Sequence, residues 1–168
     1  DSNVIRHEAD YFMIDAHYET DNGTEEILHS AMKRGVKKQF KRNKKAYKRL
    51  SEHIGLVPLI IVSPNDTFLI QGGSEERRRF LDMVIAQYDN TYIDNLNAYN
   101  KALLQRNTLL KMETEPDITL MELWEEEMAR YGEAVYQRRE AFVSDFIPVF
   151  QDIYRTISGE KETVTLKY

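Results

Sequence analysis

The 168-residue chain is long enough to bury a hydrophobic core, and it carries a formal net charge of −5 from 23 basic and 28 acidic residues. It has no cysteine, which excludes disulfides and thiolate metal sites and fits a reducing compartment. No apolar run approaches the roughly 18 residues of a membrane span, and no signal peptide is visible. We therefore expect a cytoplasmic protein without a membrane partner.

The first third of the chain predicts antiparallel strands. Residues 11–19 alternate between apolar and polar positions, as a half-buried strand does. Asn22-Gly23 follows and is a strong hairpin signal, because both turn residues must take positive φ. Residues 25–33 then form the return strand, although residues 26–32 are also compatible with a helix.

Basic residues are concentrated in the next stretch. Lys33 to Arg49 holds ten basic residues and no acid, which leaves 13 basic and 28 acidic residues elsewhere. We expect a third strand over 36–42, a tight turn at Asn43-Lys44, a short strand over 45–47, and a helical turn over 49–54 that ends at Gly55. The basic tract is thus predicted to be an antiparallel ribbon.

Such charge asymmetry indicates a charged partner rather than a particular fold. One interpretation is sequence-independent contact with phosphates, which weakens with salt. The other is a solvated edge that prevents strands of different molecules from pairing. We expect contact with the DNA backbone through Lys37, Lys38, Lys41, Arg42, Lys44, Lys45 and Lys48.

The apolar run at 56–62 predicts a strand covered on both faces. Ser63-Pro64-Asn65-Asp66 then resembles a capping box that opens a short helix over 67–70. A second N-terminus follows Gly72-Gly73, where Ser74 is a suitable N-cap and Glu75 and Glu76 lie in the first turn.

Two long helices are expected after this point. Residues 74–88 form a first helix and residues 92–112 a longer one, with a heptad seam. The predicted seam residues are Ile93, Leu96, Asn100, Leu103, Asn107 and Leu110. We expect Asn107 to donate or accept a hydrogen bond across the helix pair.

A polar turn at 113–117 leads into the last helix. Its predicted apolar stripe consists of Trp124, Met128, Tyr131, Val135, Phe142, Phe146, Val149 and Ile153, with Arg138 inserted. Pro148 should kink this helix, which should pack antiparallel on the preceding one as a hairpin. A final strand is expected over 163–168.

Several spaced motifs resemble the RecF family of bacterial recombination and repair ATPases. They are Gly72-Gly73-x-x-x-Arg77-Arg78-x-Phe80-Leu81-Asp82, then Tyr92 and Leu96, then Gln105-Arg106-Asn107 with Leu109-Leu110-Lys111. Residues 62–66, Leu123-Trp124 and Arg138-Arg139 also match, although Asn65 stands where an acid is common. The resemblance covers most of the chain.

The same resemblance indicates what this chain lacks. Such ATPases carry a phosphate-binding loop, but none of the seven glycines here is followed by lysine. Residues 157–160 resemble the ATPase signature only superficially, because they close a helix instead of opening one. We therefore interpret the chain as a middle piece of a longer protein and expect no catalytic residue, no metal site and no cofactor in the piece itself.

For the parent protein, the resemblance implies ATP and Mg as cofactors, ATP-dependent dimerisation on DNA, and RecO, RecR and RecA as partners at single-strand gaps and junctions. It implies nucleotide sensing by Ser63 and Asp66. It also implies anchoring of the helical lobe to the sheet by Arg77, Arg78, Asp82, Gln105, Arg106 and Asn107.

The predicted fold class is therefore α+β: an antiparallel β part of an ATP-binding lobe (1–71), an α-helical lobe with an antiparallel hairpin (72–160), and a strand returning to the β part (161–168). The predicted function is ATP-dependent DNA binding that helps load a recombinase. The alternative is a helical interaction or dimerisation module without DNA contact.

Overall fold

The computed structural model describes residues 2–113 and 115–168, and the chain divides into two compact units, Asp1–Leu56 and Val57–Tyr168. The first unit is a sheet and the second is helical, so the α+β class is confirmed. The predicted lobe boundary between residues 71 and 72 remains a prediction about the parent protein.

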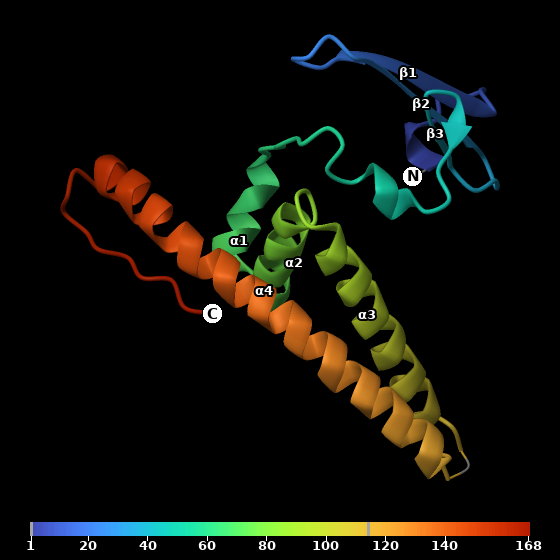
Figure 1. The fold of residues 1–168 in the computed structure, drawn as a ribbon. Helices are drawn as coiled ribbons and strands as arrows, with labels where there is room; N and C mark the ends of the chain where they lie inside the picture. The colour runs from blue at the N-terminus through green and yellow to red at the C-terminus, as the bar shows by residue number, and fades with distance from the viewer. Residues whose placement is uncertain (1, 114) are drawn as a thin grey trace. The chain divides into compact units, whose positions relative to one another are not determined.

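The sheet unit is a four-stranded antiparallel meander with strand order β1-β2-β3-β4 (Figure 1). The strands are β1 (Tyr11–Glu19), β2 (Glu25–Lys33), β3 (Gln39–Arg42) and β4 (Lys45–Ala46). The hairpin of β1 and β2 is confirmed, with Tyr11 opposite Lys33 and Glu19 opposite Glu25. Its loop spans residues 20–24, and of the predicted turn pair Gly23 takes a positive φ, 78°, whereas Asn22 does not. The helical alternative for residues 26–32 is wrong, and the third strand is shorter than predicted.

The turn between β3 and β4 is also confirmed. Asn43 and Lys44 both take positive φ, 50° and 69°, as a two-residue hairpin turn requires. A 3₁₀ turn, Leu50–His53, follows and packs its His53 ring on Phe40 and Tyr47. Ile5 and Leu28 are the buried apolar residues of this unit among those described.

The predicted strand over 56–62 is wrong. Residues 58–62 have no regular structure, and Ile60 and Val62 are 90% and 85% exposed. Pro58 has no N–H to donate, and the helical unit to which the segment belongs has no strand among the residues described that could pair its remaining backbone groups. The predicted strand over 163–168 is absent from the described residues for the same lack of a partner.

The helical unit begins with a 3₁₀ turn, Pro64–Thr67, and a single helical turn, α1 (Phe68–Gln71). Three longer helices follow: α2 (Ser74–Ile85), α3 (Asn90–Leu110) and α4 (Ile118–Ser158). Gly73, not Ser74, is the N-cap of α2, and no side chain caps it. Gly159 ends α4 in the left-handed conformation, so residues 157–160 do close a helix.

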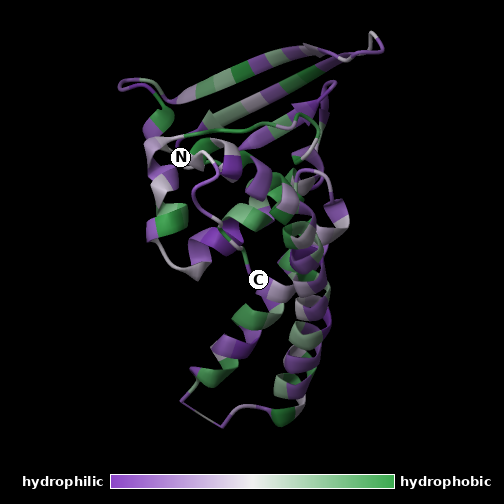
Figure 2. Cartoon of the chain, turned by 90° about the vertical axis from the view of Figure 1, so that its left-hand side faces the viewer, coloured by the Kyte–Doolittle hydropathy of each residue, from purple (hydrophilic) through white to green (hydrophobic). Residues whose placement is uncertain are grey.

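The hairpin of α3 and α4 is antiparallel as predicted (Figure 1), but its register differs. Asn100 and Asn107 are exposed, while Ala102 is buried and Arg106 is half-buried. On α4, Val149 and Ile153 are exposed, and the inward stripe passes instead to Phe150 and Tyr154. A straight helix repeats every 3.6 residues, so a strict heptad drifts off the packed face. Figure 2 shows apolar and polar residues alternating along both helices.

The core of the helical unit lies where α2, α3 and α4 meet. Ile85, Tyr92 and Val135 are buried there, with Leu81, Leu96 and Phe142 packed against them. Each of the three helices contributes one buried side chain, so this cluster holds the base of the hairpin together.

We expect Ile85→Ala to lower the free energy of unfolding of the helical unit by about 3 kcal/mol, because it leaves a cavity at a site with no solvent exposure. Met83→Ala, at a side chain 57% exposed on the same helix, should change it by less than about 0.5 kcal/mol. Trp124, the only tryptophan, reports on this unit during denaturant unfolding. Equal losses for the two variants would contradict this assignment of the core.

Candidate nucleic-acid interface

The predicted DNA-binding residues all lie on the β3–β4 hairpin and the loops that flank it. Lys41 and Arg42 are in β3, Lys44 is in the turn and Lys45 is opposite Arg42 in β4. Lys37, Lys44, Lys45 and Lys48 are exposed, and Lys38, Lys41 and Arg42 are half-buried. The basic ribbon, defined here as these seven residues, is thus one continuous piece of the sheet unit.

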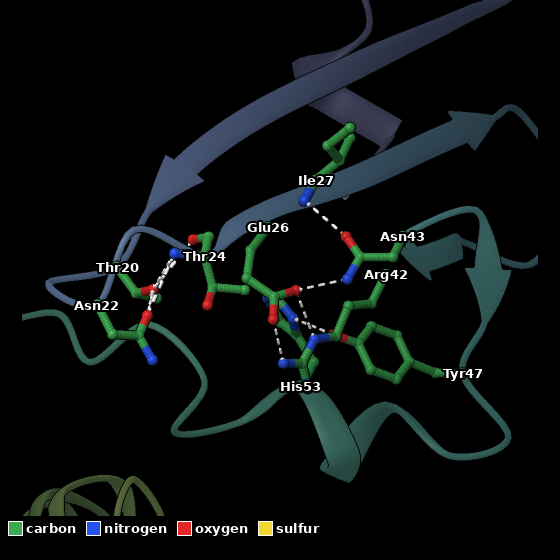
Figure 3. A network of polar contacts seen from close by, with 9 residues as sticks. All are labelled: Thr20, Asn22, Thr24, Glu26, Ile27, Arg42, Asn43, Tyr47 and His53. Carbon is green, nitrogen blue, oxygen red and sulfur yellow. Dashed lines mark hydrogen bonds and ion pairs between the residues drawn. The ribbon is translucent and has the colours of Figure 1, made fainter.

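Arg42 differs from the lysines because Glu26 already binds it (Figure 3). Its Nε and Nη2 atoms donate to the two carboxylate oxygens of Glu26, at 2.8 and 2.5 Å. Asn43 donates to the same carboxylate at 2.9 Å and accepts from the Ile27 N–H at 2.9 Å. The hydrogen bond from Arg42 lowers the pKa of Glu26. Arg42 therefore fixes β3 against β2 through its Nε and Nη2 donors, and its contact with DNA stays a prediction.

The lysines of the basic ribbon have different surroundings from Arg42. No carboxylate among the described residues forms an ion pair with Lys37, Lys41, Lys44, Lys45 or Lys48. Lys38 has an interaction partner within the chain. On the covered side of the ribbon, the Tyr47 hydroxyl lies 3.3 Å from His53 Nδ1, and burial raises the pKa of Tyr47.

Ser63 and Asp66 form the predicted capping box. The Ser63 N–H donates to the Asp66 carboxylate at 2.6 Å, and the Asp66 N–H donates to the Ser63 carbonyl at 3.0 Å. The structural role of this pair is therefore clear, while nucleotide sensing stays a prediction.

The arginines at the start of α2 have separate surroundings. Arg77 Nη1 donates to the carbonyls of Leu69 and Gly72, at 3.2 and 3.1 Å, and so caps the C-terminus of α1. Arg78 is exposed and has no polar partner among the residues described. Arg77 thus joins α2 to α1 within the helical unit, and anchoring of the helical lobe to the sheet by Arg77 and Arg78 stays a prediction.

Asp82 belongs to a polar cluster at the base of the hairpin. Arg139, on α4, donates from Nε and Nη2 to the Asp82 carboxylate at 2.8 and 2.9 Å. The buried Tyr92 hydroxyl donates to Asp82 and accepts from Arg139 Nε, and Arg139 Nη1 donates to the Tyr168 hydroxyl at 3.2 Å. Burial and the bond to Asp82 raise the pKa of Tyr92, so this hydroxyl remains a donor. Although burial opposes the charge of Arg139, its hydrogen bonds raise its pKa.

A second ion pair lies beside this cluster. Arg138 Nε donates to Asp89 at 2.6 Å, and Asp89 also caps α3 by accepting from the Tyr92 N–H at 3.0 Å. Burial would raise the pKa of Asp89, but these hydrogen bonds hold it below its usual value.

The role of Arg139 was not predicted from the sequence. Its position, four residues after Val135 and three before Phe142, was the available signal, because it places the side chain in the inward stripe.

Gln105, Arg106 and Asn107 do not act together. Arg106 Nε donates to Glu125 at 2.9 Å and joins α3 to α4. Gln105 is half-buried, and Asn107 is exposed without a hydrogen bond to α4 among the described residues. The expected bond from Asn107 is therefore not formed.

Residues 2–113 and 115–168 contain no group of three or more His, Asp or Glu side chains arranged to hold a metal ion. Within the same residues, no helix is long and apolar enough to cross a membrane.

The chain is similar in sequence to two proteins named "DNA replication and repair protein RecF". It is 58% identical to the protein of Bacteroides fragilis (strain YCH46) and 56% identical to that of Bacteroides thetaiotaomicron, in each case over the whole chain. The chain spans about 45% and 46% of their lengths. No protein-family model matches it.

Two solved structures are also similar. A recombination mediator protein RecF with ATPrS, described as part of the RecFOR pathway, superposes with a TM-score of 0.87 at 28% identity, over 94% of this chain and 43% of that one. The corresponding structure with ATP gives the same TM-score at 27% identity. In sequence and in fold, the chain therefore resembles a part of bacterial proteins that are named for DNA replication and repair. It corresponds to a middle segment of RecF.

The Arg139 cluster yields a stability prediction. We expect Arg139→Met to destabilise the helical unit by about 3 kcal/mol, because it leaves the half-buried Asp82 carboxylate without its cation. Arg130→Met is the matched control: that arginine is largely exposed, and its long contact with Glu127 contributes less than about 0.5 kcal/mol. Trp124 fluorescence during urea unfolding measures both, and a loss below about 1 kcal/mol for Arg139→Met would show that the cluster is dispensable.

Proposed function

We propose that the chain contributes a DNA-contacting surface to a RecF-family protein of replication and recombinational repair. The observation that carries the proposal is the set of five lysines on the basic ribbon without a carboxylate partner among the residues described. Several unneutralised amines on one hairpin and its flanking loops attract a polyphosphate and release its counterions. No helix of the described sheet unit accompanies them that would read base edges, so the contact is independent of sequence.

The parent protein, in this proposal, binds DNA in an ATP-dependent manner and helps to load a recombinase at single-strand gaps. The structures of relatives with ATP and ATPrS support ATP as its cofactor, with Mg as the accompanying ion. The RecFOR pathway named for those structures supports RecO and RecR as partners. RecA as the loaded recombinase and an ATP-dependent homodimer as the active form complete the proposal. The segment itself supplies binding and not hydrolysis.

The lysines can be tested by charge reversal. We expect the combined change Lys44→Glu, Lys45→Glu and Lys48→Glu to weaken binding to DNA of unrelated sequences at least about ten-fold at about 50 mM salt. The slope of log affinity against log salt should fall in magnitude by about one for each phosphate that the variant no longer neutralises. Fluorescence anisotropy over a salt series measures both quantities.

A control of equal charge separates the ribbon from net charge. Lys101→Glu, Lys111→Glu and Lys167→Glu, all on exposed lysines of the helical unit, make the same change in net charge. This control should retain most of the affinity. If the two triple variants lose affinity equally, or if neither does, the ribbon is not the DNA contact.

One observation favours the alternative, an interaction module. Val149, Ile153 and Ile157 recur every four residues on α4 and are 55%, 56% and 78% exposed. An apolar stripe of this kind marks a protein interface. If the chain is an interaction or dimerisation module, Ile153→Glu should convert a dimer into a monomer in size-exclusion chromatography without nucleotide, while the ribbon variant should not. A chain that is already monomeric at high concentration would count against self-association.

A further inference from the structure

A shallow groove lies on the sheet unit between the start of β1 and the loop that joins β2 to β3. It is lined chiefly by Tyr11, Ala31, Lys33, Val36, Lys37 and Gln39. These residues combine an aromatic ring, an apolar floor and two ammonium groups, and none of the functions considered above uses the ring.

Tyr11 is the distinctive member of the groove. Its side chain is 58% exposed, and it stacks on no other aromatic ring of the residues described. Tyr11 lies directly opposite Lys33 in the β1–β2 pair, so the two side chains project from the same face of the sheet. The next carboxylate along this face of β1, Asp15, is bound to His29 at 2.6 Å. The ring is therefore presented beside an ammonium group whose charge has no carboxylate partner within the groove.

The loop that forms the other wall is held in place before any ligand binds. Arg34 donates from its backbone N–H to the Asp10 carbonyl at 3.1 Å, and from its side chain to the carbonyls of Ala9 and Ile5, at 3.3 Å each. Gly35 takes a positive φ of 70°, and the Val36 N–H donates to the Lys33 carbonyl at 3.1 Å. Arg34 thus orders the turn, and a preorganised wall reduces the entropy lost on binding.

We propose that this groove binds an unpaired nucleobase stacked on Tyr11, with the adjoining phosphates on Lys33 and Lys37. Aromatic side chains accept any base in this way, because every base has a π-face, and flanking lysines follow the backbone. A base inside a duplex is already stacked on its neighbours and does not reach the ring. The groove therefore gives the ribbon a preference for single-stranded over double-stranded DNA. This inference rests on the proposed DNA contact and adds a selectivity to it.

The test measures binding of this 168-residue chain to a labelled single strand and to a duplex of the same sequence. Tyr11→Ala should weaken single-strand binding about five-fold or more and leave duplex binding unchanged, since the variant has no ring on which a base can stack. Tyr11→Phe keeps the ring and should bind as the unmodified chain does. Tyr18→Ala is the matched control, because this tyrosine is 40% exposed near the other end of β1 and projects from the opposite face.

A second measurement does not depend on how a variant folds. A single strand whose bases are replaced by abasic sites keeps its phosphates, so the unmodified chain should bind it about as weakly as Tyr11→Ala binds the intact strand. Equal affinity of the unmodified chain for the intact and abasic strands would overturn the inference.

The outcomes also distinguish base stacking on Tyr11 from DNA contact by the basic ribbon. If the ribbon variant loses affinity for both DNA forms while Tyr11→Ala behaves as the unmodified chain, the lysines bind DNA and the stacking site is wrong. If neither variant changes affinity, the DNA contact itself fails.

Discussion

The helical unit depends on the fork that Arg139 makes with Asp82 and Tyr92. A guanidinium that is 12% exposed needs a carboxylate, and Asp82 supplies one from a different helix. The Arg139 guanidinium also donates hydrogen bonds to the hydroxyls of Tyr92 and of Tyr168, the last residue of the chain. Tyr92 also belongs to the apolar core with Ile85 and Val135, so the polar network and the core share one residue. The Phe80-Leu81-Asp82 motif thereby acquires a physical purpose.

The sheet unit also uses arginines for hydrogen bonds within the chain, but most of its basic residues are lysines. Its arginines and lysines have different roles: Arg42 and Arg34 bind carboxylate and carbonyl groups of the chain, whereas five lysines of the basic ribbon remain without carboxylate partners among the described residues. The planar guanidinium suits fixed, multiple hydrogen bonds, and the flexible ammonium suits a solvated contact with a mobile polyanion. A count of positive charges alone overstates the surface that is available to a ligand.

Local signals in the sequence predicted local structure well. The β1–β2 hairpin, the Ser63–Asp66 capping box and the long helices are confirmed because each depends on residues close in sequence. The strand over 56–62 failed because a strand requires a neighbour and Pro58 weakens it further. The seam through Asn107 failed because a heptad pattern was extended along a helix that repeats every 3.6 residues. The role of Arg139 was not predicted because its partners, Tyr92 and Asp82, lie 47 and 57 positions away in the sequence.

The hydrogen bonds and ion pairs between α2, α3 and α4 lie mainly at one end of the hairpin, around Asp82, Asp89, Arg138 and Arg139. Beyond them, the two long helices rely on side-to-side contact and on the Arg106–Glu125 pair. The distal turns are therefore modular: whole turns can be added to or removed from both helices together without disturbing the base. Evolution can tune the reach of this arm independently of the fold that carries it.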